Sequence, residues 1–295
     1  MSRWNRSDMH NLSGRTVVVT GASSGLGLRT ATELAAAGVR VVLAVRSLAK
    51  GREAAESIAG RTDVRELDVA DLNSVNRFAS EWTGDIDVLV NNAGIMEVPF
   101  AVTADGYESQ AATNYLGPFA LTNLLLPHIT DRVVFVGSQL HRMGKIHLDD
   151  LAGTARPYKK SDAYRDSKLA ITLLGLELQR RLDLAHSPVR AIVAHPGIAS
   201  TNLSRHAMSG KITHALRFLF NDIPTASLSL LYAATEDVPG NSYVGPRGPG
   251  GLKGHPVLGQ PAAAGRDGNL AEVLWSATER LLGITFSPLP SGELA

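Results

Sequence analysis

Apolar, largely β-branched runs alternate along this chain with segments of helical spacing. Extended runs occupy residues 16–20, 39–45, 64–67, 86–91, 132–137 and 189–194, and helical spacing marks 26–37, 49–59, 73–82, 107–126 and 163–182. This alternation is typical of βαβ units that build a parallel sheet. The runs are almost continuously apolar, as strands covered on both faces must be. We therefore expect an α/β fold: a doubly wound parallel sheet of about seven strands with helices on both faces.

The second half of the chain is less regular. Residues 200–225 are mixed, and residues 239–268 hold the cluster Gly245-Pro246-Arg247-Gly248-Pro249-Gly250-Gly251, which predicts a loop rather than a helix. Residues 269–282 return to helical spacing. Without an internal repeat or a linker, we expect one domain over 1–295. Its halves would span about 12–140 and 141–295, with 200–225 as a loop or lid.

Composition narrows the function classes. The 295 residues are 44% apolar and 19% charged with a net charge of +1, so nothing favours nucleic acid as a partner. The absence of cysteine excludes disulfides, thiolate metal sites and cysteine nucleophiles, and suits a cytoplasmic protein. The dispersed histidines lack metal-ligand spacing, so we expect no metal. The first 15 residues carry charges without an apolar run, and no run approaches a bilayer-spanning length, so we expect no leader and no membrane span.

A glycine-rich turn directly follows the first predicted strand. In this strand–turn–helix setting Gly21 permits a tight turn, Gly25 lets a pyrophosphate approach the backbone, and Gly27 lets helix and strand pack closely. The unpaired N–H groups at the helix start suit phosphate oxygens. The expected dinucleotide-binding residues are Gly21, Ser23, Ser24, Gly25, Leu26 and Gly27. Taken alone, the motif is also compatible with a tight turn that binds no cofactor.

The spacing Gly21-x3-Gly25-x-Gly27 after Thr20 resembles the cofactor motif of the short-chain dehydrogenase/reductase family, and further motifs of that family follow in order. Asn114, Ser138 and the pair Tyr164-x3-Lys168 resemble its catalytic residues. The resemblance covers about residues 12–201 and implies a Rossmann-type fold that binds a nicotinamide cofactor. The remaining cofactor contacts that it implies are Asp68, Val69, Asn91, Ala93, Gly94, Tyr164, Lys168, Pro196, Gly197, Ile198 and Thr201.

Two segments narrow the resemblance. Tyr164-Arg165-Asp166-Ser167-Lys168-Leu169-Ala170 and His195-Pro196-Gly197 resemble the retinol-dehydrogenase-like branch and its bacterial relatives. The family often has a second serine after the catalytic one, and here that place is taken by Gln139. The substrate contacts beside Ser138 are therefore not given by the resemblance.

The catalytic set has a chemical rationale. A free tyrosine has a pKa near 10, and Lys168, four residues after Tyr164 on one helix face, is a cation that would lower it. The resemblance implies that Tyr164 exchanges the proton, Ser138 orients the substrate oxygen, Lys168 also lies against the nicotinamide ribose, and Asn114 holds a water that connects Lys168 to solvent. A Tyr-x3-Lys pair alone also occurs on ordinary helix surfaces, but the order of the whole set favours the catalytic interpretation.

The end of the second predicted strand bears on the cofactor. It reads Leu43-Ala44-Val45-Arg46-Ser47 and lacks the acidic residue that binds the ribose 2′-hydroxyl of NAD. The Arg46 guanidinium suits a 2′-phosphate, so we predict NADP, with NAD less favoured. A solvated strand-end arginine is the alternative.

Apolar residues after Thr201 bear on the substrate. With Met143 they suggest a pocket for a lipophilic alcohol, aldehyde or ketone, although they could instead pack the segment onto the body. The expected function is an NADP-dependent oxidoreductase that interconverts alcohol and carbonyl. A catalytically silent NADP(H)-binding regulator and a nucleotide-sugar epimerase or dehydratase are the alternatives, and a homo-oligomer stays open. These apolar residues are Leu203, Met208, Ile212, Leu216, Phe218, Leu219 and Phe220.

Overall fold

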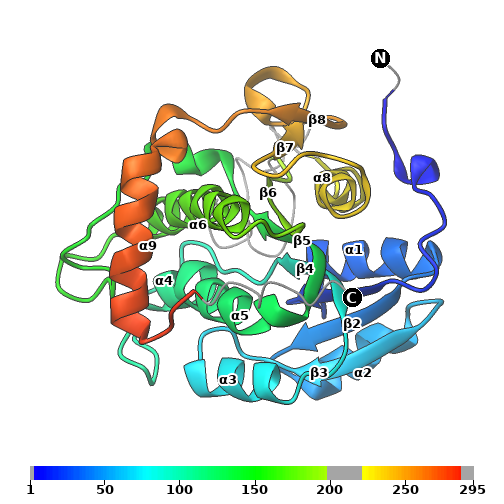
Figure 1. The fold of residues 1–295 in the computed structure, drawn as a ribbon, viewed down its shortest axis with the longest axis horizontal. Coiled ribbons are helices and arrows are strands. Elements are labelled where there is room, and N and C mark those ends of the chain that lie inside the picture. The colour runs from blue at the N-terminus through cyan, green and yellow to red at the C-terminus, as the bar shows by residue number, and fades with distance from the viewer. Residues whose placement is uncertain (1–2, 198–220, 287–295) are drawn as a thin grey trace, which may run out of the picture.

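The computed structural model describes residues 3–197 and 221–286, and within them eight strands form one sheet in the order β3-β2-β1-β4-β5-β6-β7-β8 (Figure 1). All neighbouring strands are parallel except β7 and β8, which are antiparallel. This order confirms the expected doubly wound α/β fold. The strands are β1 (Thr16–Thr20), β2 (Arg40–Val45), β3 (Thr62–Glu66), β4 (Ile86–Asn91), β5 (Ile129–Val136), β6 (Arg190–Ala194), β7 (Tyr243–Pro246) and β8 (Pro256–Gly259).

Helices cover both faces of the sheet, and each face has its own apolar core. Within β1, Val17 and Val19 belong to one core and Val18 to the other, which is why the strand has to be apolar throughout. One face carries α1 (Gly25–Ala36), α2 (Leu48–Glu56) and α8 (Ile223–Thr235); the other carries α3 (Leu72–Ser80), α5 (Gly117–Leu125) and α6 (Lys160–Leu184).

The helix α9 (Gly268–Leu282) packs against α5 and α6, and it is drawn in orange-red in Figure 1. The Trp275 ring lies 4.8 Å from the Phe119 ring of α5, centre to centre. The Arg181 guanidinium of α6 lies 4.7 Å from the centre of the Trp275 ring. The helical spacing expected for 269–282 is therefore confirmed, and its apolar side is buried against the body.

The predicted loop over 239–268 is wrong in part, because it contains the hairpin of β7 and β8. Proline is tolerated at edge strands, and Pro256 lies on β8, at the edge of the described sheet. Gly245 on β7 is required by packing, because a Cβ there would collide with the His195 ring. Short 3-10 turns, η7 (Pro249–Gly251) and η8 (Ala263–Arg266), occupy part of the remainder.

Two further differences concern helices. The helix expected around 107–126 is divided into α4 (Ser109–Ala111), a π-helical turn η2 (Ala112–Leu116) and α5. The helix α8 was not predicted, because its sequence IPTASLSLLYAAT is apolar almost all round. Such a helix has little amphipathic periodicity, since it is buried on most sides.

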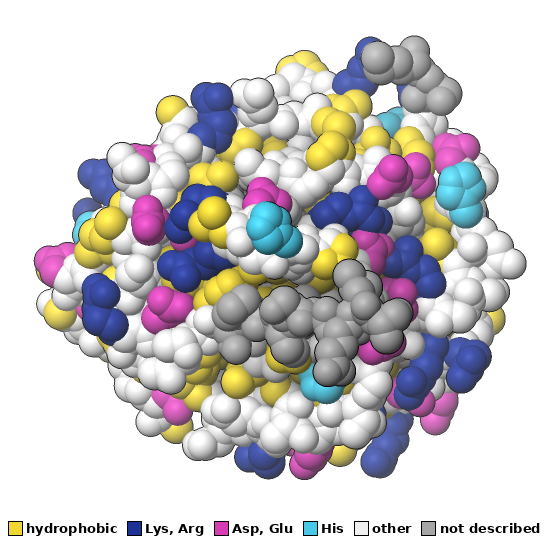
Figure 2. Space-filling view, in the orientation of Figure 1, with side chains coloured by type: hydrophobic (Ala, Val, Ile, Leu, Met, Phe, Trp, Pro, Cys, Tyr) yellow, Lys and Arg dark blue, Asp and Glu magenta, His cyan; other side chains and the backbone are white. Residues whose placement is uncertain are grey.

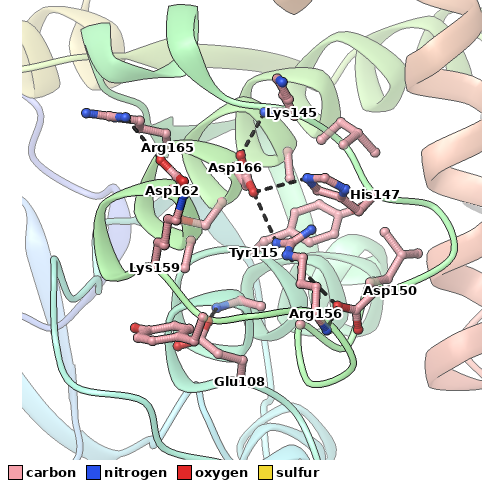
Figure 3. A pocket seen from close by; sticks show the side chains of 18 of the residues that line it. Glu108, Tyr115, Lys145, His147, Asp150, Arg156, Lys159, Asp162, Arg165 and Asp166 are labelled. Carbon is pink, nitrogen blue, oxygen red and sulfur yellow. Dashed lines mark hydrogen bonds and ion pairs between the residues drawn. The ribbon is translucent and has the colours of Figure 1, made fainter.

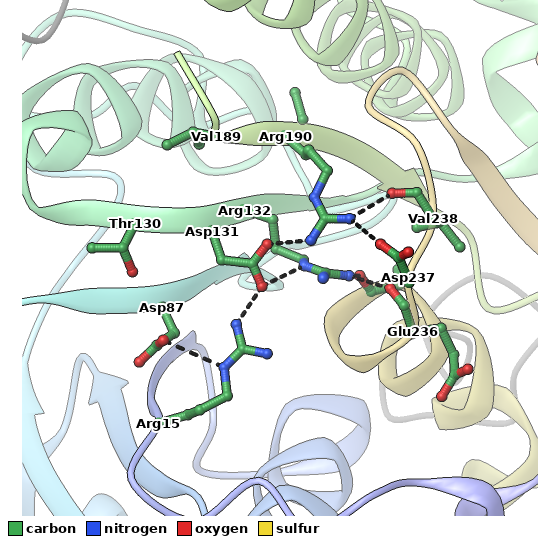
Figure 4. Close-up of polar contacts among 12 residues, drawn as sticks. Arg15, Asp87, Thr130, Asp131, Arg132, Val189, Arg190, Glu236, Asp237 and Val238 are labelled. Carbon is green, nitrogen blue, oxygen red and sulfur yellow. Dashed lines mark hydrogen bonds and ion pairs between the residues drawn. The ribbon is translucent and has the colours of Figure 1, made fainter. Parts of the chain in front are cut away.

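A cluster of charges ties the amino ends of the central strands together (Figure 4). Asp131 of β5 is bonded to Arg15, Arg132 and Arg190. Arg132 is only 2% exposed, and its Nη1 also donates to the carbonyls of Ala233 and Glu236. Burial alone would raise the pKa of Asp131, but its bonds to Arg190 and Arg15 and the nearby Arg132 lower it overall. This edge of the sheet is therefore fixed by ion pairs.

Two observations bear on partners. On the described part of the face drawn in Figure 2, Lys and Arg side chains are interspersed with Asp and Glu and form no basic stripe. None of the described helices combines the length and the apolar character needed to cross a bilayer.

Candidate active site

The sequence motifs converge at the carboxyl edge of the sheet. The glycine turn follows β1, the Asn92-Ala93-Gly94 turn follows β4, Ser138 follows β5, and the Pro196-Gly197 turn follows β6. The chain crosses over between β1 and β4, and open α/β sheets bind ligands at the carboxyl ends beside such a crossover.

The glycine turn has the conformation that its residues predict. Gly21 has φ +66°, and a Cβ there would lie 3.0 Å from the Ala93 Cα. A Cβ on Gly27 would collide with the Asn92 side-chain amide and the Gly21 carbonyl, so close packing of α1 requires glycine at that place. Space is open beside Gly25.

The turns after β1 and β4 are locked to each other by Thr20. Its Oγ1 accepts hydrogen bonds from the N–H groups of Asn92, at 3.0 Å, and Ala93, at 2.9 Å. The Asn92 Nδ2 donates to the Thr20 carbonyl at 2.8 Å. The Asn91 side chain points away from this edge, because its Nδ2 donates to Thr122 Oγ1 inside the core. Any cofactor contact of Asn91 would therefore involve its backbone.

The start of α1 fits the phosphates of a dinucleotide. Ser24 is the N-cap of α1, yet its side chain makes no capping hydrogen bond, which leaves the first N–H groups of the helix to a ligand. The open space at Gly25 adjoins these groups. Ser23, Ser24 and Leu26 lie in the same turn. The cradle thus has both the shape and the donors that a pyrophosphate needs.

The residues expected around the adenosine half lie at the ends of β2 and β3. Arg46 is exposed directly after β2 and makes no ion pair with any residue that the structure describes. Asp68 is partly buried, and its Oδ1 accepts from the Ala70 N–H at 3.0 Å. Val69 is buried, and its carbonyl is approached so closely by α5 that a Cβ on Gly117 would collide with it. The end of β2 adjoins the glycine turn, because the Gly21 N–H donates to the Ala44 carbonyl at 2.8 Å, and β3 pairs with the other side of β2.

Tyr164, Ser138 and Lys168 come together as the sequence predicts. The Tyr164 side chain is only 6% exposed, and its hydroxyl interacts with Ser138, which acts to lower the tyrosine pKa. The Lys168 Nζ lies 5.7 Å from the centre of the Tyr164 ring and donates to the Val136 carbonyl at 2.8 Å. Tyr164 and Lys168 share one face of α6, so the helix presents both to the end of β5.

The expected lowering of the tyrosine pKa by Lys168 is wrong for this structure. Burial raises the pKa of Tyr164 to about 12; the Ser138 hydrogen bond lowers it only in part, and the charge of Glu97 raises it further. Burial also lowers the pKa of Lys168 to about 8. The Tyr164 hydroxyl is therefore protonated and uncharged at neutral pH in this structure.

Asn114 lies in the π-helical turn η2, a local irregularity frequent at functional sites. Its Oδ1 accepts from the Ile95 N–H, and its Nδ2 donates to the Ile95 carbonyl and to Ser167 Oγ, each at 2.9 Å. A Cβ on Gly94 would lie 3.2 Å from Asn114 Oδ1 and 3.8 Å from Lys168 Nζ, so both groups lie against Gly94. The Asn114 amide is thus held in the neighbourhood of Lys168.

Glu97 is a site residue that sequence reasoning missed. Its φ of +51° is strained for a residue with a side chain, and its N–H donates to the Oε1 of the fully buried Gln110 at 2.8 Å. Gln110 is itself bound to Tyr158 at 2.8 Å, and Tyr158 donates to the Val98 carbonyl. No motif pointed to Glu97, because its backbone conformation is imposed by this surrounding network.

No sequence pattern indicated that His141 and His195 bind a metal. In the structure both side chains make hydrogen bonds that support the site. The His141 Nδ1 lies 2.6 Å from the Ser138 carbonyl, and its Nε2 accepts from the Ala262 N–H at 2.9 Å. The Nδ1–H tautomer satisfies both bonds. His195 is 1% exposed, and its Nε2 lies 3.0 Å from the side-chain nitrogen of Gln139. Burial lowers the pKa of His195 to about 3 and keeps it uncharged.

Several expected contacts lie outside the described residues. They are Ile198, Thr201 and most of the segment 200–225, including every apolar residue from Leu203 to Phe220 that was assigned to the substrate pocket. Met143 is described and is 53% exposed. Pro196 and Gly197 are described and directly follow β6.

A cavity of about 590 Å³ lies beside α6, whose residues Asp162, Arg165 and Asp166 help to line it (Figure 3). Asp166 lies at its centre, where it accepts from the Lys145 N–H at 2.7 Å and from Arg156 at 3.1 Å. His147 Nε2 approaches Asp166 to 3.7 Å. None of the expected catalytic residues lines this cavity, so it is separate from the site at the carboxyl edge. Among the described residues, no group of three His, Asp or Glu side chains is placed to hold a metal ion.

Comparisons with known proteins agree with the geometry. The family model described as short chain dehydrogenase matches residues 15–211. Human retinol dehydrogenase 13 is 37% identical over 92% of this chain and 85% of its own length. Mouse polyprenol dehydrogenase is 38% identical over 92% of this chain and 84% of its own length. A crystal structure of an uncharacterized protein from Mycobacterium paratuberculosis is 47% identical with a TM-score of 0.87, and the match covers 97% of this chain and 100% of that one.

Proposed function

From the premise that this chain belongs to the short-chain dehydrogenase/reductase family, we propose that it is an NADP-dependent enzyme that interconverts a lipophilic alcohol and its carbonyl compound. Membership makes the chain an oxidoreductase that acts on CH–OH groups with a nicotinamide cofactor. One observation carries the proposal: the buried Tyr164 lies with Lys168 and Ser138 at the carboxyl edge of the sheet, with the Lys168 Nζ 5.7 Å from the centre of the tyrosine ring.

The proton step belongs to Tyr164. Its raised pKa keeps the hydroxyl protonated at neutral pH, so it can donate to the oxygen of a carbonyl substrate during reduction. The bound nicotinamide supplies or accepts the hydride. Ser138 orients the substrate oxygen toward Tyr164, and the bond from His141 to the Ser138 carbonyl keeps the serine in place. As the family resemblance implies, a water held by Asn114 would connect Lys168 to solvent and allow the tyrosine to be reprotonated.

The residues at the ends of β2 and β3 support NADP as the cofactor. Arg46 is exposed and free of ion pairs with described residues, so its guanidinium is available to a 2′-phosphate. Asp68 and Val69 would contact the adenine, and Gly21 to Gly27 would hold the pyrophosphate. Lys168, Ala93, Gly94, Pro196, Gly197, Ile198 and Thr201 would hold the nicotinamide half.

The names of the relatives support a lipophilic substrate, because they are retinol dehydrogenases and a polyprenol dehydrogenase. A series of aldehydes of increasing chain length tests this assignment. We expect kcat/KM to improve by up to about 0.8 kcal/mol per methylene until the pocket is full. A flat series, or a preference for short anionic keto acids, would contradict it.

The catalytic assignment is tested by Tyr164→Phe. We expect kcat to fall by a factor on the order of 10² or more, because only the proton-transferring hydroxyl is removed. Thermal stabilisation by NADPH should persist, since a ligand stabilises by mass action. A wild-type protein that binds NADPH but reduces no aldehyde or ketone in a broad panel would instead be a silent NADP(H)-binding regulator.

A further inference from the structure

Asn221 is a fully buried asparagine whose side chain joins the Pro196-Gly197 turn to the Gly/Pro loop of residues 247–254 between β7 and β8. Its Nδ2 donates to the Pro196 carbonyl at 3.0 Å, and its Oδ1 accepts from the Gly254 N–H at 3.2 Å. Its exposed fraction is 0%. Because water does not reach these groups, each hydrogen bond would be costly to lose.

The Pro196-Gly197 turn is held from both sides. The peptide group between Pro196 and Gly197 is held at both of its polar atoms. The Gly197 N–H donates to His195 Nδ1 at 3.2 Å, and the Pro196 carbonyl accepts from Asn221. Gly197 has φ +75°, and a Cβ there would lie 2.9 Å from Asn221 Nδ2 and from Pro246 Cγ. The turn is thus packed against Asn221 with no room to spare.

The Gly/Pro loop contacts both residues that hold the turn, His195 and Asn221. A Cβ on Gly251 would collide with the Gln139 side-chain amide and lie 3.2 Å from His195 Cε1. The loop is also bonded to Asn221, because the Gly254 N–H donates to Asn221 Oδ1. It therefore connects the turn after β6 with Gln139, the residue that follows Ser138.

We propose that Asn221 is a positioning residue for the cofactor: by holding the Pro196 carbonyl, it fixes the turn against which the nicotinamide end binds. This inference rests on the proposed function, which assigns that turn to the cofactor. Asn221 acts on the turn and leaves the proton step at Tyr164 unchanged. Its loss therefore weakens cofactor binding more than it slows turnover at saturating cofactor.

The first test is Asn221→Leu, which keeps a similar volume and removes both hydrogen bonds. We expect the Kd for NADPH, measured by fluorescence titration, to rise on the order of tenfold. The KM for NADPH should rise in parallel while kcat at saturating NADPH changes far less, the pattern of lost binding without lost transition-state stabilisation. An unchanged Kd and KM would contradict the inference.

The second test is Asn221→Asp, which retains the acceptor for the Gly254 N–H. Its carboxyl can donate to the Pro196 carbonyl only when protonated. NADPH affinity of this variant should therefore fall, relative to wild type, as pH rises through the pKa of the introduced carboxyl. A side chain that only fills space would give parallel pH dependences for the two proteins.

The control is Asn123→Leu. Asn123 is also a buried asparagine, and it donates to the Phe119 carbonyl at 2.9 Å within α5. Whatever this substitution does to the melting temperature, NADPH affinity should stay at the wild-type value, and an equal loss would overturn the inference.

Wild type is titrated first: if it fails to bind NADPH and NADH, the proposed function itself is wrong. If it binds and both Asn221 variants match it at every pH, only the role of Asn221 is wrong.

Discussion

The Lys168 ammonium donates to the Val136 carbonyl at 2.8 Å, while it lies 5.7 Å from the centre of the Tyr164 ring. Its partner is thus the backbone at the end of β5, and burial lowers its pKa to about 8. The lysine is placed between the strand end and the tyrosine, the position from which, under the proposed function, it would serve both the cofactor and the proton step.

Lys168→Met should damage catalysis and cofactor binding together. The substitution keeps an unbranched apolar stem and removes the cation, so we expect kcat to fall on the order of 10² and the Kd for NADPH to rise. Steady-state kinetics with parallel NADPH titrations measure both quantities. Tyr164→Phe is the matched control, because it should lower kcat while the Kd stays near wild type. A Lys168→Met protein with wild-type NADPH affinity would remove the lysine from the cofactor site.

Arg46→Ala should weaken NADPH binding selectively. The guanidinium follows β2 without an ion pair among the described residues, and charge-assisted bonds to a phosphate are among the stronger polar contacts. We expect the preference for NADPH over NADH to fall on the order of tenfold or more. Titration of both cofactors against both proteins measures it. Equal affinities of the wild type for the two cofactors would contradict the assignment of NADP.

Glu97→Gln should shift the pH profile toward lower pH. Burial is the main cause of the raised pKa of Tyr164, and the Glu97 charge adds to it, so removing that charge lowers the pKa. The alkaline rise of alcohol oxidation, which needs the phenolate, should then begin at lower pH, and carbonyl reduction should be lost at lower pH. Rate profiles from pH 6 to 11 test this. An unchanged profile would place the carboxylate away from the tyrosine.

The buried histidines should make the fold less stable in mild acid. Burial lowers the pKa of His195 to about 3, whereas an unfolded histidine titrates near 6.5. The unfolded state therefore binds more protons than the folded state between these values, and stability falls with decreasing pH across this window. One such group contributes up to about 1.4 kcal/mol per pH unit. Urea denaturation at pH 6.5 and 4.5 measures the loss, which should be smaller in His195→Gln.

The sequence was sufficient for most of the sheet, because strands buried on both faces leave a strong apolar signal. The bounds of β1 and β4 agree with the prediction to the residue. It was insufficient for β7 and β8, where Gly245 and Pro256 carry turn signals although they lie in strands. Those residues are dictated by a distant side chain, the His195 ring, and by the position of β8 at the edge of the described sheet, and a local pattern contains neither.

The candidate site shows the same division. Tyr164, Ser138, Lys168 and Asn114 belong to ordered motifs, and the structure brings them together. Glu97 and Asn221 belong to no motif, because each is defined by hydrogen bonds to residues far along the chain. The direction of the Tyr164 pKa shift could not be predicted from the sequence either, because desolvation depends on packing that residue spacing alone does not give.

The contact of the Gly/Pro loop with the turn after β6 has a consequence for synthesis on the ribosome. By the time residue 197 has emerged, the nascent chain already carries the glycine turn, Tyr164 and the first six strands. It still lacks Asn221, whose Nδ2 donates to the Pro196 carbonyl, and Gly254, whose N–H donates to Asn221 Oδ1. Under the proposed function, a growing chain would therefore complete its phosphate cradle early, whereas the turn proposed for the nicotinamide end would be held only after residues 247–254 have left the exit tunnel.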